Sequence, residues 1–84
     1  MNKKKLRIDF CDFHWYYTKT DNFFYHLLRE RFDVEITDQA DFVIYGSYGH
    51  EHRLHAGVRI FASWESGLPD YTECDYSISC LKVV

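Results

Sequence analysis

The sequence is poor in the residues that cross-link or interrupt small folds, with three cysteines, four glycines and one proline among its 84 residues. Cys11, Cys74 and Cys80 are odd in number, widely spaced and without a Cys-x-x-Cys pair. This pattern argues against a disulfide framework and against a metal site built on cysteine. We expect three reduced thiols, two of them buried as small apolar side chains.

Long apolar runs are also missing. None approaches the roughly 18 residues that a membrane span requires. Asp9 and Asp12 interrupt residues 1–20, where a signal peptide would need an apolar core. We therefore expect a cytoplasmic chain with no membrane span.

The chain has no excess of basic charge, because its formal net charge is −3 at pH 7. Such a chain has no general attraction to nucleic acid or to anionic lipid. The basic run over residues 3–7 has two interpretations, a solvated lead-in to the first strand or a phosphate-binding patch. We favour the first and expect no nucleic-acid partner.

The common cofactor fingerprints are missing as well. No Gly-x-Gly-x-x-Gly follows the first predicted strand, and no Gly-Lys-Ser/Thr loop is present. His50, Glu51, His52 and His55 form a cluster, but its spacing is not the His-Glu-x-x-His of zinc proteases. We expect no cofactor and no metal, and interpret the cluster as a polar loop that contacts a polyhydroxylated or anionic ligand; metal binding is the alternative.

Apolar residues are nevertheless abundant, since 46% of the residues are hydrophobic and 19% are aromatic. This composition excludes a disordered chain. A chain of this length makes a single domain, residues 1–84, which buries roughly 60–65% of the surface of the unfolded chain.

The apolar pattern predicts short strands and one long helix. Leu6, Ile8 and Phe10 alternate with polar residues, as in a strand with one buried face. Apolar residues at three- and four-residue spacing predict a helix that begins at a capping residue within 20–22. The predicted elements are strands over 5–11, 34–37, 42–45, 58–62 and 76–79, a helix over 22–32, and a helical turn or loop over 50–55.

This order of elements predicts an α/β, Rossmann-like layered fold with a mostly parallel sheet of about five strands. One helix cannot cover both faces of such a sheet. We therefore expect an uncovered apolar sheet face, to be covered by a second domain, by further chain or by another copy in a homo-oligomer.

Two stretches carry candidate chemistry. Glu65 follows the strand over 58–62, and the carboxyl ends of parallel strands line the ligand crevice of an open α/β sheet. It is a candidate general base, and an exposed loop glutamate is the alternative. The loop of His14, Trp15 and Tyr16 offers the aromatic faces and hydrogen-bonding groups that a sugar ring requires; its alternative is packing on the sheet edge.

These stretches resemble a known family. Residues 59–78, Arg-Ile-Phe-Ala-Ser-Trp-Glu-Ser-Gly-Leu-Pro-Asp-Tyr-Thr-Glu-Cys-Asp-Tyr-Ser-Ile, are similar to the α-1,3-fucosyltransferase segment (glycosyltransferase family 10) written Arg-Val/Ile-Phe-Tyr-Thr-Gly-Glu-Asn-x-x-Pro-Asn/Asp-Phe-x-x-x-Asp-Tyr-Ala-Ile. The residues in register are Arg59, Phe61, Glu65, Pro69, Asp70, Asp75, Tyr76 and Ile78. Residues 22–28, 33–36 and 41–45 continue the likeness, which covers residues 5–79.

The resemblance implies the amino-terminal, acceptor-side domain of a GT-B enzyme that transfers fucose from GDP-fucose to a glycan hydroxyl with inversion. It implies that Glu65 is the catalytic base. The residues expected to contact the glycan acceptor are His14, Trp15, Tyr16, Trp64 and His50.

This chain departs from the family pattern in two ways. Trp64 stands where the family has glycine, which would block or reshape the acceptor site. The donor-binding domain is not among these 84 residues, so we expect no turnover by the chain alone. The alternative is a standalone carbohydrate-binding or protein-interaction module without catalysis.

Overall fold

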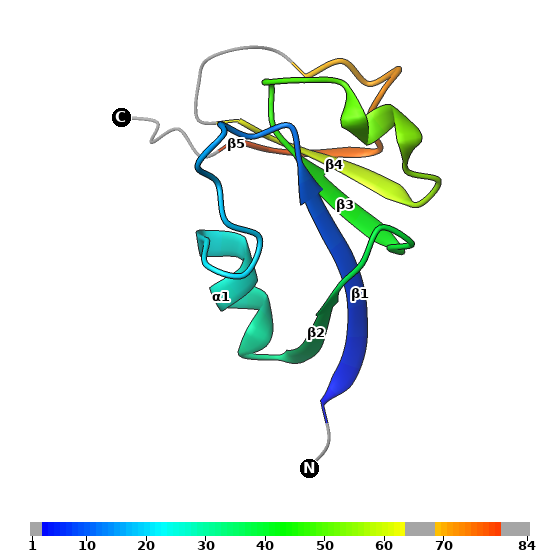
Figure 1. Cartoon of the computed structure of the whole chain (residues 1–84). Helices are drawn as coiled ribbons and strands as arrows, with labels where there is room; N and C mark the ends of the chain where they lie inside the picture. Colours follow the sequence, from blue (N-terminus) through cyan, green and yellow to red (C-terminus); the bar gives the residue numbers. More distant parts are fainter. Residues whose placement is uncertain (1–2, 64–68, 80–84) are drawn as a thin grey trace.

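Five strands, one α-helix and one 3-10 helix succeed one another in the computed structural model, which describes residues 3–63 and 69–79 (Figure 1). They are β1 (Lys4–Cys11), α1 (Phe23–Arg29), β2 (Phe32–Ile36), β3 (Phe42–Tyr45), the 3-10 helix η1 (Glu51–Leu54), β4 (Val58–Ser63) and β5 (Tyr76–Ser79). All five predicted strands and the helical turn are confirmed, with bounds that differ by one or two residues.

The predicted helix over 22–32 is correct at its start and too long at its end. The Asn22 side chain caps α1 by accepting a hydrogen bond from the Tyr25 N–H at 2.9 Å. Phe32 continues the helical spacing in the sequence, yet it is the first residue of β2 and pairs with Lys4 of β1. Strand pairing therefore takes precedence over the helical period in these last residues.

All neighbouring strands run parallel, in the order β2-β1-β3-β4-β5. This confirms the predicted α/β class and the parallel sheet. The chain steps from β1 to β2 in one direction and then adds β3, β4 and β5 in the other. In open parallel sheets, ligands bind outside the carboxyl ends of the strands where this direction reverses, which here lies between β1 and β3.

A short link joins β2 to β3 across β1. Ile8 of β1 pairs both with Ile36, the last residue of β2, and with Phe42, the first residue of β3. The two strands therefore flank different halves of β1, and residues 37–41 cross it without a helix. Because of this stagger, the link is shorter than the roughly dozen residues that a parallel crossover usually needs.

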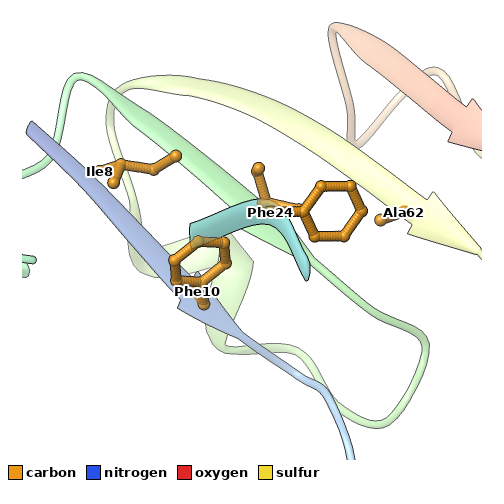
Figure 2. Packing of buried hydrophobic residues seen from close by; sticks show 5 residues of the cluster. Ile8, Phe10, Phe24 and Ala62 are labelled. Carbon is orange, nitrogen blue, oxygen red and sulfur yellow. The ribbon is translucent and has the colours of Figure 1, made fainter. Parts of the chain in front are cut away.

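The two faces of the sheet have different cores, with α1 on one side and η1 on the other (Figure 1). The α1 face carries an apolar core of Ile8, Phe10, Phe24, Ile44 and Ala62 (Figure 2). The opposite face carries a smaller cluster of Cys11, Val43, Tyr45 and Cys74. Two free cysteines are buried in this cluster, as expected, and Cys80 lies outside the described residues.

Helix α1 leaves part of its sheet face uncovered, as the sequence predicts. Phe23 and Leu27 of α1 are 60% and 51% exposed, and Ile78 of β5 is 39% exposed. They border an apolar groove of about 410 Å³ between the helix and the strands. Neither helix in the described part of the chain is long and apolar enough to cross a membrane. The cytoplasmic location stays a prediction.

Candidate functional site

Backbone hydrogen bonds tie the chain after β1 to the chain after β3. The Gly46 N–H donates to the Cys11 carbonyl at 3.1 Å, and the Tyr48 N–H donates to the Asp12 carbonyl at 2.8 Å. Asp12 has a left-handed φ of 61°, which aspartate adopts more readily than most residues. A defined turn therefore joins the ends of β1 and β3, where the order of the strands reverses.

The Asp12 carboxylate organises η1. Its side chain is 3% exposed and accepts hydrogen bonds from the backbone N–H groups of Glu51 and His52, both at 2.9 Å. A Cβ on Gly49 would lie 2.7 Å from the Asp12 Oδ1 atom, so a larger residue there would displace the Asp12 carboxylate. Burial opposes ionisation most strongly, but the hydrogen bonds from His52 and Glu51 together outweigh it and lower the pKa of Asp12.

His52 links Asp12 to the turn before β5. Its Nδ1 lies 2.7 Å from Asp12 Oδ2, its Nε2 lies 3.0 Å from Glu73 Oε1, and its ring stacks on Tyr45 at 3.9 Å. A hydrogen bond from Arg53, followed by one from His52, lowers the pKa of Glu73 to about 2. Each ring nitrogen of His52 therefore faces a carboxylate oxygen.

A second buried carboxylate, Asp9 of β1, holds two other segments. Its side chain is 6% exposed; Oδ1 lies 2.8 Å from Lys19 Nζ, and Oδ2 lies 3.4 Å from His55 Nε2. Lys19 belongs to the loop after β1, and His55 follows η1. Asp9 and Asp12 together therefore anchor the segments that surround the carboxyl end of β1.

The aromatic loop after β1 presents its rings to solvent. Trp15 is 94% exposed and Tyr16 is 65% exposed. The two rings meet edge to face at 5.4 Å, and Tyr16 stacks on His14 at 3.7 Å. Tyr48, from the segment after β3, is 66% exposed. Its ring and the His14 ring are arranged edge to face, with their centroids 6.3 Å apart. Aromatic faces from two loops thus gather around His14.

A cavity of about 130 Å³ lies beside this aromatic group. It is lined by Phe10, Cys11, Asp12, Phe13, His14, Tyr17, Lys19 and Glu51. His14 Nδ1 is buried and has no hydrogen-bond partner within the described residues. Burial first, and then the carboxylates of Asp12, Asp9 and Glu51 in that order, raise the pKa of the Cys11 thiol to about 12. The cavity therefore combines a negative field with unused hydrogen-bonding capacity.

The predicted site residues belong to three segments of the chain. His14, Trp15 and Tyr16 lie together at the carboxyl end of β1. His50 is exposed just before η1, with its ring centroid 6.2 Å from that of His52. Trp64 and Glu65 lie outside the described residues, directly after the carboxyl end of β4 at Ser63 in the sequence. Their roles as acceptor contact and base stay predictions.

The histidine cluster separates in the structure. His52 is engaged with Asp12 and Glu73, and His55 is engaged with Asp9. No group of three or more His, Cys, Asp or Glu side chains within residues 3–63 and 69–79 is arranged to hold a metal ion. Asp9 and Asp12 were not predicted as site residues, although Asp9 lies in the apolar alternation of β1 and Asp12 directly follows that strand. A carboxylate in a buried strand is a signal of function or of a buried ion pair.

Comparison with known protein families gives one finding for this chain. The model of the alpha-(1,3)-fucosyltransferase FucT N-terminal domain matches residues 8–83. The chain has no significant match among curated proteins or among solved structures.

Proposed function

The chain belongs to the alpha-(1,3)-fucosyltransferase FucT N-terminal domain family, and on that premise we propose that it is the acceptor-binding domain of an inverting fucosyltransferase. The complete enzyme would transfer fucose from GDP-fucose to a glycan hydroxyl. The family match over residues 8–83 is the observation that carries this proposal. The match describes the N-terminal domain, and the proposal assigns GDP-fucose to the donor-binding domain of the GT-B pair.

The carboxyl edge of the sheet supports an acceptor role. Exposed aromatic rings at Trp15, Tyr16 and Tyr48 suit the apolar face of a sugar, and His14 and His50 offer hydrogen bonds to its hydroxyls. The loops here have none of the glycine-rich patterns that cradle a nucleotide phosphate. This edge is therefore better suited to a glycan than to GDP-fucose.

In the proposed reaction, Glu65 accepts the proton of the acceptor hydroxyl while the hydroxyl oxygen attacks C1 of fucose. The new C1–O bond forms on one face as the bond from C1 to the GDP phosphate breaks on the other, and GDP leaves. Trp64 and the aromatic loop hold the acceptor in place. Both substrates must be held in bonding geometry, so we expect no product from an N-terminal domain by itself.

A fusion of this chain to the donor-binding domain of a family enzyme tests the proposal. The fusion is expected to fucosylate N-acetyllactosamine, and Glu65→Gln is expected to lower kcat by about 10²–10⁴-fold, the usual contribution of a general base. Glu30→Gln, at the exposed C-cap of α1, is the matched control and should retain activity. Equal activity of the Glu65→Gln and parent fusions would exclude Glu65 as the base.

The uncovered α1 face favours a second candidate function, a non-catalytic interaction module that self-associates. Phe23, Leu27 and Ile78 border an apolar groove of about 410 Å³ on this face. A second copy of the chain that packs on this groove would give a symmetric homo-oligomer. Sedimentation equilibrium tests this: a concentration-dependent dimer supports it, and a monomer at high protein concentration contradicts it.

A further inference from the structure

The carboxylates around the cavity at the end of β1 differ in whether a basic side chain contacts them. Each of the two buried aspartates has basic side chains as partners: Asp9 contacts Lys19 and His55, and Asp12 contacts His52. Glu51 also lines the cavity, and its carboxylate forms no ion pair within the described residues. Glu51 is therefore a carboxylate of the cavity wall that no described side chain pairs with.

Cys11 lies in the cavity wall and is affected by the carboxylates around it. Burial raises the pKa of its thiol to about 12, with further contributions from Asp12, then Asp9 and finally Glu51. A field that disfavours a thiolate also disfavours a carboxylate or sulfate on a ligand at this position.

The aromatic group next to the cavity supplies the complementary feature. Trp15 and Tyr16 are exposed. They lie next to the cavity, because Tyr16 stacks on the His14 ring and His14 lines the cavity. An aromatic face beside a polar pocket is the arrangement that binds a pyranose, whose C–H face is apolar and whose edge is hydroxylated. The volume of about 130 Å³ fits the edge of one ring and excludes a whole disaccharide.

Resting on the proposed acceptor role, we propose that this cavity and the rings of Trp15 and Tyr16 form a subsite for one uncharged pyranose, and that the Glu51 carboxylate excludes acidic sugars. The pyranose stacks on the aromatic rings and directs its hydroxyls toward Glu51 and Lys19. Glu51 accepts hydrogen bonds from neutral hydroxyls and repels a ligand carboxylate. A buried unpaired atom is unfavourable, so a loop shift that lets a hydroxyl reach His14 Nδ1 favours the bound state.

Two ligands that differ in one group test the subsite with the chain as it is. The first is N-acetyllactosamine, and the second is the same disaccharide with its galactose C6 oxidised to a carboxylate. Titrations followed by ¹H–¹⁵N NMR give Kd for each. The parent chain is expected to bind the neutral ligand about tenfold or more tightly than the acidic one, because like charges at contact are costly.

Three variants separate stacking from charge. Trp15→Ala is expected to weaken binding of the neutral ligand by about tenfold, the size of one lost aromatic contact. Glu51→Gln is expected to leave neutral binding within about twofold and to bring the acidic ligand within about threefold of it, because the amide still accepts a hydrogen bond. Tyr76→Ala, at a 64%-exposed tyrosine of β5, is the control and should match the parent. Circular dichroism verifies that each variant is folded.

The outcomes distinguish this subsite from the broader function. If neither ligand binds the parent chain, the subsite and the proposed acceptor role both fail. If the neutral ligand binds and Trp15→Ala has no effect, the acceptor role stands and the subsite is wrong. If Trp15→Ala weakens binding while Glu51→Gln keeps the preference for the neutral ligand, the assignment of Glu51 is overturned.

Discussion

The two faces of the sheet differ in kind although alternating residues of one strand line both. Ile8 and Phe10 of β1 belong to the apolar core under α1, whereas Asp9 contacts Lys19 and His55 on the opposite side. On the first face the fold is held by non-directional burial. On the second, hydrogen bonds and ion pairs fix where the loops lie.

The two faces of the sheet therefore have different roles in the fold. Apolar contacts tolerate small displacements, but a carboxylate that receives three hydrogen bonds, as Asp12 does from Glu51 and His52, permits one arrangement. Buried charges contribute little net stability compared with apolar residues of the same size. Their role here is positional, since they hold the loops that carry the candidate acceptor residues.

Removing an apolar side chain from the α1 face should have the largest effect. Phe10 is 1% exposed, and Phe10→Ala is expected to lower the free energy of unfolding by about 3–5 kcal/mol through lost burial and the cavity that remains. Equilibrium unfolding in urea measures this decrease in the free energy of unfolding. The change should be independent of pH between 3 and 7, because no charge is altered. A strongly pH-dependent loss would show that the two faces are coupled.

A substitution on the charged face should have the second-largest effect on the free energy of unfolding, and this effect should depend on pH. Asp12→Asn keeps a residue that tolerates the left-handed backbone but removes the charge opposite His52. We expect a loss of about 2–3 kcal/mol at pH 7, since one partner of a buried pair is left behind. Urea unfolding across a pH series measures this. Asp41→Asn, at a 63%-exposed side chain, is the control and should change stability little.

The pH series has a defined direction in the parent chain. The pKa values of Asp12 and Glu73 are lower in the folded chain than their ordinary values, and that of Glu73 falls from 4.5 to about 2. The stability that they contribute is therefore present above about pH 4.5 and is lost as the pH falls toward 2. Asp12→Asn should reduce this loss of stability at acid pH. An equal loss in the variant and the parent would show that Asp12 does not contribute to it.

Much of the α1 face is predictable from the sequence, and most of the charged face is not. The alternation around Ile8 and Phe10 identified β1, and the position of that strand's end located the loop of His14. Phe32 shows the limit of local patterns, since its spacing fits a helix while its pairing with Lys4 places it in β2.

The charged contacts escape prediction because they join residues that are far apart in sequence. His52 is 40 residues from Asp12 and 21 from Glu73. The histidine spacing indicated a cluster, yet His52 and His55 bind different carboxylates. Only the register of parallel strands, which brings the ends of β1 and β3 together, determines these partners.

The smallest expected effects compare two lysines of β1 and its loop. Lys5 pairs with Glu35 at 3.4 Å, and both side chains are about half exposed, at 58% and 45%. Lys19 pairs with Asp9 at 2.8 Å, and the Asp9 side chain is 6% exposed. Lys5→Ala should change the free energy of unfolding by less than about 0.5 kcal/mol, because solvent already screens the exposed pair. Lys19→Ala should cost about 1–3 kcal/mol, because it leaves a buried carboxylate short of a partner.

The lysine comparison also tests whether charge on the second face positions the aromatic loop. Lys19 ties the loop after β1 to Asp9, so Lys19→Ala should shift the NMR resonances of Trp15 and Tyr16, whereas Lys5→Ala should not. Urea unfolding and ¹H–¹⁵N spectra of both variants give the two readouts. Equal stability losses would mean that burial of the carboxylate does not decide the strength of the pair. Unmoved loop resonances in Lys19→Ala would mean that the aromatic loop holds its position without Asp9, and its order would then rest on the Asp12 turn alone.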